Sequence, residues 1–387
     1  MSGTLKLLLA LPVCALLTAC GGDTTTSISS GSDASSDSSD SSSSSSSSGS
    51  FDVADYKDLT TSACAGDTQM DILVCAVDAF LGTLSSSELS SVQYSWSQTS
   101  KRTTWSNLPT NSVQRNGLSL GSLSSESQAA FMLVARAALS DQGYEDMLGV
   151  MAADEYLVEQ GGQSSGYGWE KYYIAVFGTP GSSEDWMLQL GGHHMAHNIT
   201  YLSGTGYPVP NHLAAEPKAS FVLNAETWGP LVDEGTSMVA IFDSLSSSEL
   251  SNAHLSGTFG DVVMGPDNGS TTLDDYPDQD GQLVSSLTSA QQALVTAAIA
   301  EWVEDYPADV ADQLMTDYTS AAAFAETYVA WGGTEANGVN VDKSGTYMRI
   351  DGPRVWIEVA CQSGVILSGT HYHTIYRDKT WDYGNSL

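Results

Sequence analysis

Residues 80–89 read FLGTLSSSEL, and the same pattern returns at residues 241–250 as IFDSLSSSEL. Two more segments repeat in the same order: YIAVFGT at 173–179 matches YVAWGGT at 328–334, and residues 186–198 match 347–358. Three matches in one order at similar offsets are hard to obtain by chance. The sequence therefore predicts an internal duplication, with halves at about 80–205 and 240–378 packed about a pseudo-two-fold axis.

In each half, the pattern of apolar residues changes once along the chain, from a helical spacing to strand-like segments. Apolar residues first recur every three or four positions after Ser-x-x-Glu or Thr-x-x-Gln starts, which predicts helices at 84–96, 123–139, 245–255 and 287–303. Aromatic and branched segments between glycine turns then predict strands at 172–177, 186–190, 195–202, 328–331, 347–350 and 354–360. The expected class is α+β, with helices packed on antiparallel sheet material from both halves.

The N-terminus reads as an export signal. Lys6 and an apolar run from 7 to 17 precede Leu17-Thr18-Ala19-Cys20, which resembles the bacterial lipobox. We expect residues 1–19 to be removed and Cys20 to be acylated, giving a membrane anchor; the alternative is an ordinary signal peptide with a chance cysteine. Gly21 after the cysteine favours an outer-membrane lipoprotein, facing either the periplasm or the cell surface.

Residues 20–50 are almost entirely Ser, Thr, Gly and Asp, too polar to order themselves, and predict a disordered tether. The folded body is then residues 51–387. The chain has a formal net charge of -33, nearly all of it in this body. Such acidity excludes a nucleic-acid partner and is typical of a soluble surface as well as of cation attraction.

Three cysteines remain after the signal and the acylated residue are set aside. Cys64 and Cys75 are close in sequence, and in an exported protein they predict a disulfide. Cys361 follows Val359 and Ala360, which indicates a buried strand thiol rather than a nucleophile.

Histidines gather in two clusters, GGHHMAHN at 191–198 and HYH at 371–373. His371 and His373 are two apart, so on a strand both imidazoles point to one side, as two ligands of one metal often do. Arg354, Trp356 and Glu358 likewise share one strand face, and the repeat overlays them on the segment of His194 and Asn198. We therefore expect a polar cleft between the halves that holds His194, Asn198, Arg354 and Glu358.

Histidine and carboxylate donors without thiolates suit a divalent metal, Zn²⁺ or Cu²⁺ first. The alternative is that these histidines are buried hydrogen-bonding residues. A serine hydrolase has little support because no Gly-x-Ser-x-Gly motif occurs. A paired-carboxylate glycosidase could use Glu358 and Asp378, whose separation the sequence does not give.

The chain also resembles a family, domain of unknown function family 3500. The resemblance rests on residues 186–198, on YMRIDGPRVWIE at 347–358, and on HYHTIYRD at 371–378 followed by Asp382-Tyr383-Gly384. It implies a shared residue set in which His197 has no part: Gly192, His193, His194, Asn198, Gly352, Pro353, Glu358, His371, His373, Arg377 and Asp378. It implies no reaction.

The leading interpretation is a metal-dependent hydrolase acting on a small or polymeric extracytoplasmic substrate. His193, His194, His371 and His373 are the candidate ligands, and the candidate catalytic residues are Glu358, Arg354, Arg377, Asp378 and Asn198. In this interpretation Glu358 is a ligand or general base, and Arg354 or Arg377 holds an anionic or carbonyl group. The rival is a non-catalytic ligand-binding or metal-binding lipoprotein using the same residues.

Overall fold

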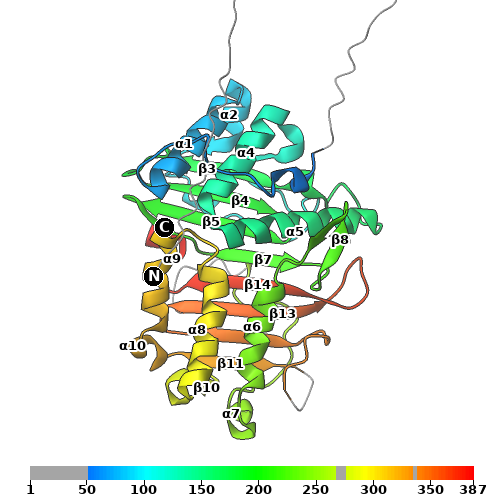
Figure 1. The fold of residues 1–387 in the computed structure, drawn as a ribbon, viewed down its shortest axis with the longest axis vertical. Coiled ribbons are helices and arrows are strands. Elements are labelled where there is room, and N and C mark those ends of the chain that lie inside the picture. Colours follow the sequence, from blue (N-terminus) through cyan, green and yellow to red (C-terminus); the bar gives the residue numbers. More distant parts are fainter. Residues whose placement is uncertain (1–50, 267–275, 334–337) are drawn as a thin grey trace, which may run out of the picture. The chain divides into compact units, whose positions relative to one another are not determined.

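The computed structural model describes residues 51–266, 276–333 and 338–387 (Figure 1). The predicted signal, Cys20 and the tether lie outside these residues. None of the described helices is long and apolar enough to cross a membrane. Cys64 and Cys75 are joined by a disulfide, with their Cα atoms 5.7 Å apart, and Cys361 is a buried free thiol.

One large, mostly antiparallel sheet organises the described body, and the predicted α+β class is confirmed. Its hydrogen-bonded order is β1-β3-β4-β5-β7-β14-β13-β12-β11-β10, with β2 on β3 and β6 on β5. The strands are β1 (Gln93–Tyr94), β2 (Leu118–Ser119), β3 (Tyr173–Gly178), β4 (Trp186–Gly192), β5 (Met195–Leu202), β6 (Thr205–Tyr207), β7 (Asn211–Ala215), β10 (Gln282–Leu283), β11 (Tyr328–Gly332), β12 (Tyr347–Asp351), β13 (Val355–Ser363) and β14 (Thr370–Asp378). A separate hairpin joins β8 (Phe221–Leu223) to β9 (Glu226–Trp228).

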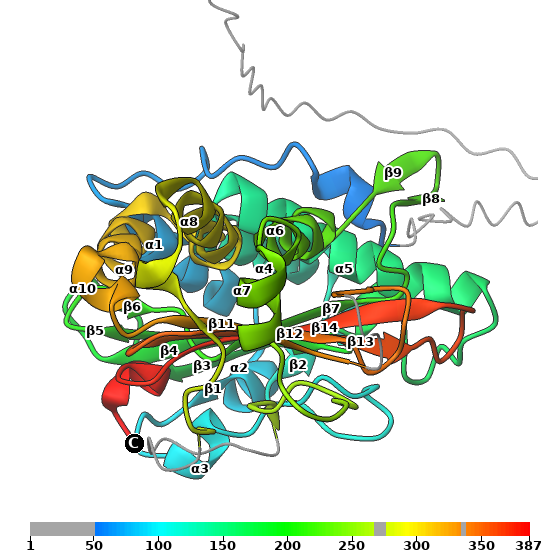
Figure 2. The same ribbon diagram turned by 90° about the horizontal axis from the view of Figure 1, so that it is seen from below.

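Helices cover one side of this sheet, which we call the helix face (Figure 2). They are α1 (Gln69–Gly82), α4 (Ser125–Ala138), α5 (Asp141–Glu159), α6 (Val232–Asp243), α8 (Ser289–Val303) and α9 (Ala308–Thr319). Their buried apolar residues form one core with sheet residues such as Ile357 and Val359. This burial removes the apolar stripe of each helix from water and fixes the helix layer on the sheet.

Local sequence explains where several helices begin. α2 (Ser86–Val92) and α7 (Ser247–Asn252) follow Ser85 and Ser246, and each serine forms a capping box with the glutamate three residues later. The expected helices at 84–96 and 245–255 are shorter than predicted. In the first of them the chain turns into β1, which pairs in parallel with β3, so a tertiary contact overrides the helical pattern.

The opposite side of the sheet, the loop face, is covered by the short helix α3 (Thr99–Arg102) and by long loop segments near residues 95–117 and 254–264 (Figure 2). A second, smaller apolar core lies there and includes Trp105, Met264 and Trp356. Trp186 packs in the helix-face core and Tyr347 in the loop-face core, so the side chains of these two residues point to opposite sides of the sheet.

The C-terminal strand lies in the middle of the sheet, not at its edge. β14 pairs with β13 on one side and with β7 on the other, and β7 also pairs with β5. Ala214 therefore lies opposite His373, while its amide donates to the carbonyl of His194 at 2.8 Å. This register brings two histidine segments, about 180 residues apart in sequence, to neighbouring positions.

Candidate metal centre

The first histidine of the centre comes from a tight turn. Gly192 and Met195 are the last pair of the β4–β5 hairpin, and His193-His194 form its two-residue turn. His194 has φ 64°, a left-handed conformation that costs a non-glycine residue energy and is enriched at functional sites. Its amide donates to the carbonyl of Asn107 at 3.0 Å, which ties the turn to the loop face.

The other two histidines project from β14 onto the loop face. His371 and His373 point to the same side of the sheet as Ile375, because residues two apart on a strand share a face. Ile375 packs in the loop-face core. The Nε2 atoms of His371 and His373 are 3.1 Å apart, and those of His373 and His194 are 3.3 Å apart. All three residues are buried, with exposed fractions of 1 to 6%.

The spacing of the three nitrogens matches a metal-ligand set. Ligands held tetrahedrally at 2.0–2.1 Å from zinc lie roughly 3.3 Å from one another. An Nε2 atom carries either a proton or a lone pair, so the central Nε2 of His373 cannot donate to one neighbour and accept from the other. Three lone pairs aimed at one cation satisfy this geometry better than hydrogen bonds among the rings.

Burial keeps the imidazoles of His194 and His371 in the neutral form that binds metals. Burial and then the neighbouring histidines lower the pKa of His371 to about 3 and that of His194 well below its ordinary value.

A carboxylate orients the central ligand from behind. Nδ1 of His373 lies 2.9 Å from Oδ1 of Asp261, so it donates its proton there and leaves Nε2 as the metal-facing lone pair. Partial burial acts to raise the pKa of Asp261, but the hydrogen bond with His373 and the electrostatic influence of His373 and His212 outweigh it and lower that pKa to about 2. Asp261 is half exposed, and it marks the edge of the centre nearest to solvent.

Two further residues complete the surroundings of the ligands. The Asn107 amide lies 3.3 Å from Nδ1 of His373. The His212 ring, on β7, lies 5.5 Å from the His373 ring, and neither of its buried nitrogens has a hydrogen-bond partner among the described residues. Sequence reasoning missed Asp261 and His212, since neither belongs to a histidine cluster or to a recognisable motif. It placed Asn107 in a stretch, residues 105–109, that fits the family resemblance, but gave it no role.

His193 points away from the three converging nitrogens. Its ring stacks on His194 at 3.6 Å between centroids, while its Nδ1 lies 2.6 Å from Oδ1 of Asp154 on α5. His193 therefore supports His194 by stacking and is held from the helix face. His197, which was left out of the expected site, contacts Tyr306 at 2.9 Å and has no part in the centre.

Glu358 lies on the loop face but does not reach the three histidines. Its carboxylate accepts hydrogen bonds from the amides of Val263 and Met264 and from Nε1 of Trp356, and it is fully buried. These bonds anchor the loop that carries Asp261. Glu358 is thus a positioning residue. It binds the loop at 263–264, and Asp261 of the same loop contacts His373. The Glu358 carboxylate itself has no lone pair directed at the centre.

Arg354 and Asp378 form a structural ion pair on the helix face. Asp378 accepts from Nη2 of Arg354 at 2.6 Å and from the Tyr318 hydroxyl at 2.7 Å, and Arg354 also pairs with Asp317 on α9. Glu358 and Asp378 therefore face opposite sides of the sheet, which removes the basis for a paired-carboxylate glycosidase.

Arg377 and Asn198 also have internal partners. Arg377 is completely buried and pairs with Asp382 at 3.3 Å. Asn198 accepts from the Gln189 amide at 2.7 Å and donates to the carbonyl of Pro210 at 2.9 Å. The expected cleft shared by His194, Asn198, Arg354 and Glu358 is not formed. Each of these side chains contacts different residues, and these contacts lie in separate parts of the body.

The structure thus brings together His194, His371 and His373 from the expected set, with Asp261 behind them. A family model described as a protein of unknown function (DUF3500) matches residues 66–385, nearly the whole described body. No curated protein and no solved structure matches.

Proposed function

Since the chain belongs to the DUF3500 family, whose description assigns no activity, we propose a function from its own geometry: a metal-dependent hydrolase in which His194, His371 and His373 bind one divalent ion. The observation that carries the proposal is the convergence of three Nε2 atoms at 3.1 and 3.3 Å, with a carboxylate behind the central ring. Three imidazoles without a thiolate favour Zn²⁺ or Cu²⁺.

Three protein ligands are the number found in catalytic zinc sites, whereas structural sites are usually closed by four. When bound, such an ion supplies Lewis-acid polarisation and makes a water molecule more acidic. The chain's own contribution is to fix the ligands: Asp261 holds the tautomer of His373, and the strained turn holds His194. The neutral His212 ring lies beside the ligands, has no hydrogen-bond partner within the described part of the chain, and is suited to hydrogen-bond a substrate group.

We infer a neutral or weakly charged extracytoplasmic substrate. Arg354 and Arg377 were expected to hold an anionic or carbonyl group, but both are already paired with buried carboxylates. The strongly acidic body also repels polyanions. These two observations argue against a nucleic-acid or other polyanionic substrate.

The second candidate is a non-catalytic metal-binding lipoprotein, and burial favours it. The three histidines are nearly inaccessible beneath the loop that carries Asp261, which leaves a polymer no direct route to them. Elemental analysis of the purified protein, combined with ester and amide hydrolysis before and after chelation, separates the two functions. Stoichiometric metal with chelation-sensitive hydrolysis supports the hydrolase. Metal without hydrolysis supports the binding protein, and no metal overturns both.

Asp261→Asn is expected to weaken metal binding without emptying the centre. The amide no longer accepts the His373 proton as strongly, so the ring loses part of its fixed orientation, and such outer-shell changes cost about 10–100-fold in affinity. Competition with a chromophoric chelator measures this change. Asp280→Asn removes the same charge from an exposed position and serves as the control. Equal affinity of Asp261→Asn and the wild type would mean that the carboxylate has no role at the centre.

We also propose that the protein is an outer-membrane lipoprotein anchored through Cys20. The support is the lipobox pattern at 17–20 and the polar tether that follows it. Cys20→Ser is expected to move the protein from the membrane fraction to the soluble fraction, since the acyl chains are lost. Immunoblots of fractionated cells test this, and a variant that stays with the membranes to the wild-type extent would contradict the lipobox interpretation.

We infer further that the body arose by duplication. The capping boxes at Ser85 and Ser246, and the short antiparallel pairs β2–β3 and β10–β11, support this inference. An experimental structure in which residues 80–205 and 240–378 do not superpose, even with Asn198 placed on Glu358, would reject it.

A further inference from the structure

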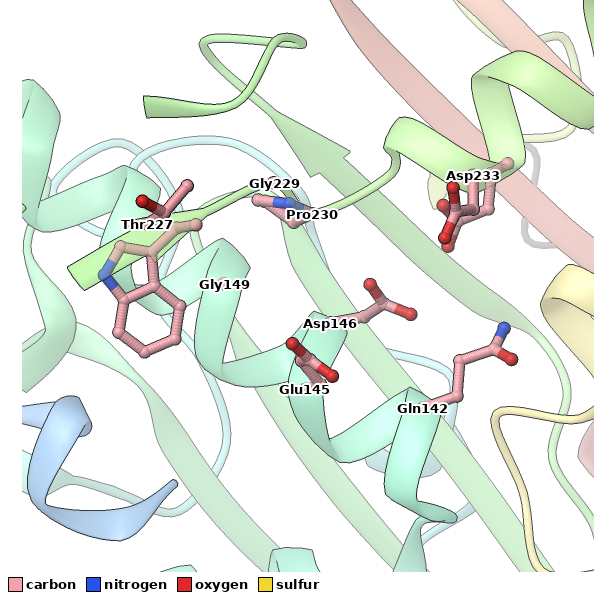
Figure 3. A pocket seen from close by; sticks show the side chains of 10 residues that line it. Gln142, Glu145, Asp146, Gly149, Thr227, Gly229, Pro230 and Asp233 are labelled. Atoms are coloured by element: carbon pink, nitrogen blue, oxygen red, sulfur yellow. The ribbon is translucent and has the colours of Figure 1, made fainter. Parts of the chain in front are cut away.

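Three acidic side chains meet on the helix face, on the other side of the sheet from the histidines. Asp146 lies on α5, Glu234 in the first turn of α6, and Asp305 in the connection between α8 and α9. One carboxylate oxygen from each residue lies within 4.8 Å of the other two. A pocket of about 200 Å³ reaches Asp146 and Glu234, and Figure 3 shows the Asp146 carboxylate extending from α5 toward the helix that carries Asp233.

Close backbone packing builds this meeting point. The amide of Ser140 donates to the carbonyl of Asp305 at 2.9 Å, which ties the α8–α9 connection to the start of α5. A Cβ atom at Gly143 would lie 2.2 Å from that same carbonyl oxygen. Glycine at 143 is therefore required for Asp305 to approach Asp146.

Two of the three acids, Asp305 and Glu234, have carboxylate oxygens without the partners that buried acids need. Asp305 is fully buried and neither of its oxygens has a hydrogen-bond partner among the described residues; the same is true of Oε1 of Glu234, which is 2% exposed. The nearby Gln142 amide donates to the carbonyl of Glu301 at 3.1 Å. An unpaired buried carboxylate is costly in its charged form, and a bound cation would supply the partner that it lacks.

Negatively charged neighbours further disfavour the ionised form of these three acids. Burial, followed by the negative charges of neighbouring acids, raises the pKa of Asp146 to about 7 and the pKa values of Glu234 and Asp305 well above their ordinary range. The neighbours outside the cluster with the largest electrostatic influence are Glu145, Asp233 and Glu301, which are all acidic.

We propose that Asp146, Glu234 and Asp305 bind one calcium ion. Calcium takes six to eight oxygen ligands at 2.3–2.6 Å, so any two of its ligands lie at most about 4.6–5.2 Å apart, and three carboxylate oxygens within 4.8 Å of one another can reach one such ion. Magnesium dehydrates reluctantly, keeps several waters and is rarely held by a cage made of protein carboxylates alone, so it suits three converging carboxylates less well. Water from the adjoining pocket completes the coordination, and convergence on one point fits an ion better than an organic ammonium group.

The ion would join three elements that the chain places far apart. It would connect α5 of the first predicted half to the α8–α9 connection of the second, and to the first turn of α6, which lies between the two predicted halves. Because a folded-state ligand stabilises by mass action, calcium at a hundred times its Kd is expected to raise the unfolding midpoint by about 4 °C for a body of this size.

Calorimetric titration of chelator-treated full-length protein with Ca²⁺ tests the proposal. We expect one equivalent to bind and the thermal midpoint to rise, with a weaker response to Mg²⁺. Asp305→Asn keeps the shape of the side chain but removes a ligand charge, so binding should fall at least tenfold. Without calcium this variant should be as stable as the wild type or more stable, because the amide replaces a buried acid whose charged form has no partner.

Asp233→Asn is the matched control, since it removes one charge from the same pocket without removing a proposed ligand. Its calcium affinity should stay within about threefold of the wild type, in line with the modest effect of exposed charges. No calcium binding by the wild type at millimolar concentration would overturn the proposal, as would equal binding by Asp305→Asn. Stabilisation by acid alone, with no response to Ca²⁺, would show that protons occupy the cluster instead.

Discussion

Replacing His371 and His373 together with alanine is expected to remove the stoichiometric metal from the purified protein. The two residues supply two of the three converging nitrogens, and one remaining imidazole cannot retain a divalent ion through purification. We expect the zinc or copper content, counted apart from calcium, to fall from about one equivalent to below about a tenth of one, since nearly all of the binding free energy comes from the ligands. Elemental analysis after gel filtration measures this, with circular dichroism to check the fold.

Two controls separate loss of ligands from loss of structure. His254→Ala removes an exposed histidine outside the centre and should leave the metal content unchanged. His194→Asn removes the third ligand, while asparagine tolerates the left-handed backbone at φ 64° better than most residues. It should lose metal as well. A folded His371/His373 double variant that keeps its full metal content would place the ion elsewhere and reject the proposed centre.

The histidine pair could be predicted from sequence because it depends on local geometry alone. Two residues two apart on a strand share a face whatever the fold, so His371 and His373 were placed together correctly. His194 was added to this pair because histidines cluster at 191–198 in the sequence. Its position beside His373 depends on how strands distant in sequence pair in the sheet. β14 lies beside β7, and β7 lies beside the β4–β5 hairpin, and no local pattern encodes that order.

Face assignments failed where side chains lie outside regular strands. Arg354 precedes β13, so strand alternation does not apply to it, and its guanidinium turns to Asp317 and Asp378. Glu358 was assigned to the same face as Trp356 correctly, but the loop amides that it binds come from a segment without a recognisable pattern. Asp261 belongs to that segment, which explains why the carboxylate behind His373 was missed.

Amino-acid composition and the periodicity of apolar residues predicted the fold class but not the order of the strands in the sheet. The predicted strands at 186–190, 195–202 and 347–350 lie within or match β4, β5 and β12, because aromatic and branched residues there alternate between two buried faces. β7, with the sequence NHLAA, has too few branched residues to be recognised as a strand. It forms because strands on both sides supply hydrogen-bond partners.

Asp378→Ala is expected to lower the free energy of unfolding by about 3 kcal/mol, since removing one member of a buried ion pair leaves its partners unsatisfied. The fully buried carboxylate accepts from Arg354, from the Tyr318 hydroxyl, and from the backbone amides of Thr380 and Trp381. All four contacts are lost at once, next to the centre of the sheet. Urea or guanidinium unfolding curves with a shared slope measure the change.

Asp317→Asn provides the matched control because Asp317 pairs with the same Arg354 guanidinium but is about one-third exposed. Solvent screens that pair, so the expected loss is below about 1 kcal/mol. Metal content should stay at the wild-type level in both variants, since Asp378 faces the helices while the three histidines face the loops. An Asp378→Ala protein that is as stable as the wild type but has lost its metal would reverse this assignment and return Asp378 to the functional site.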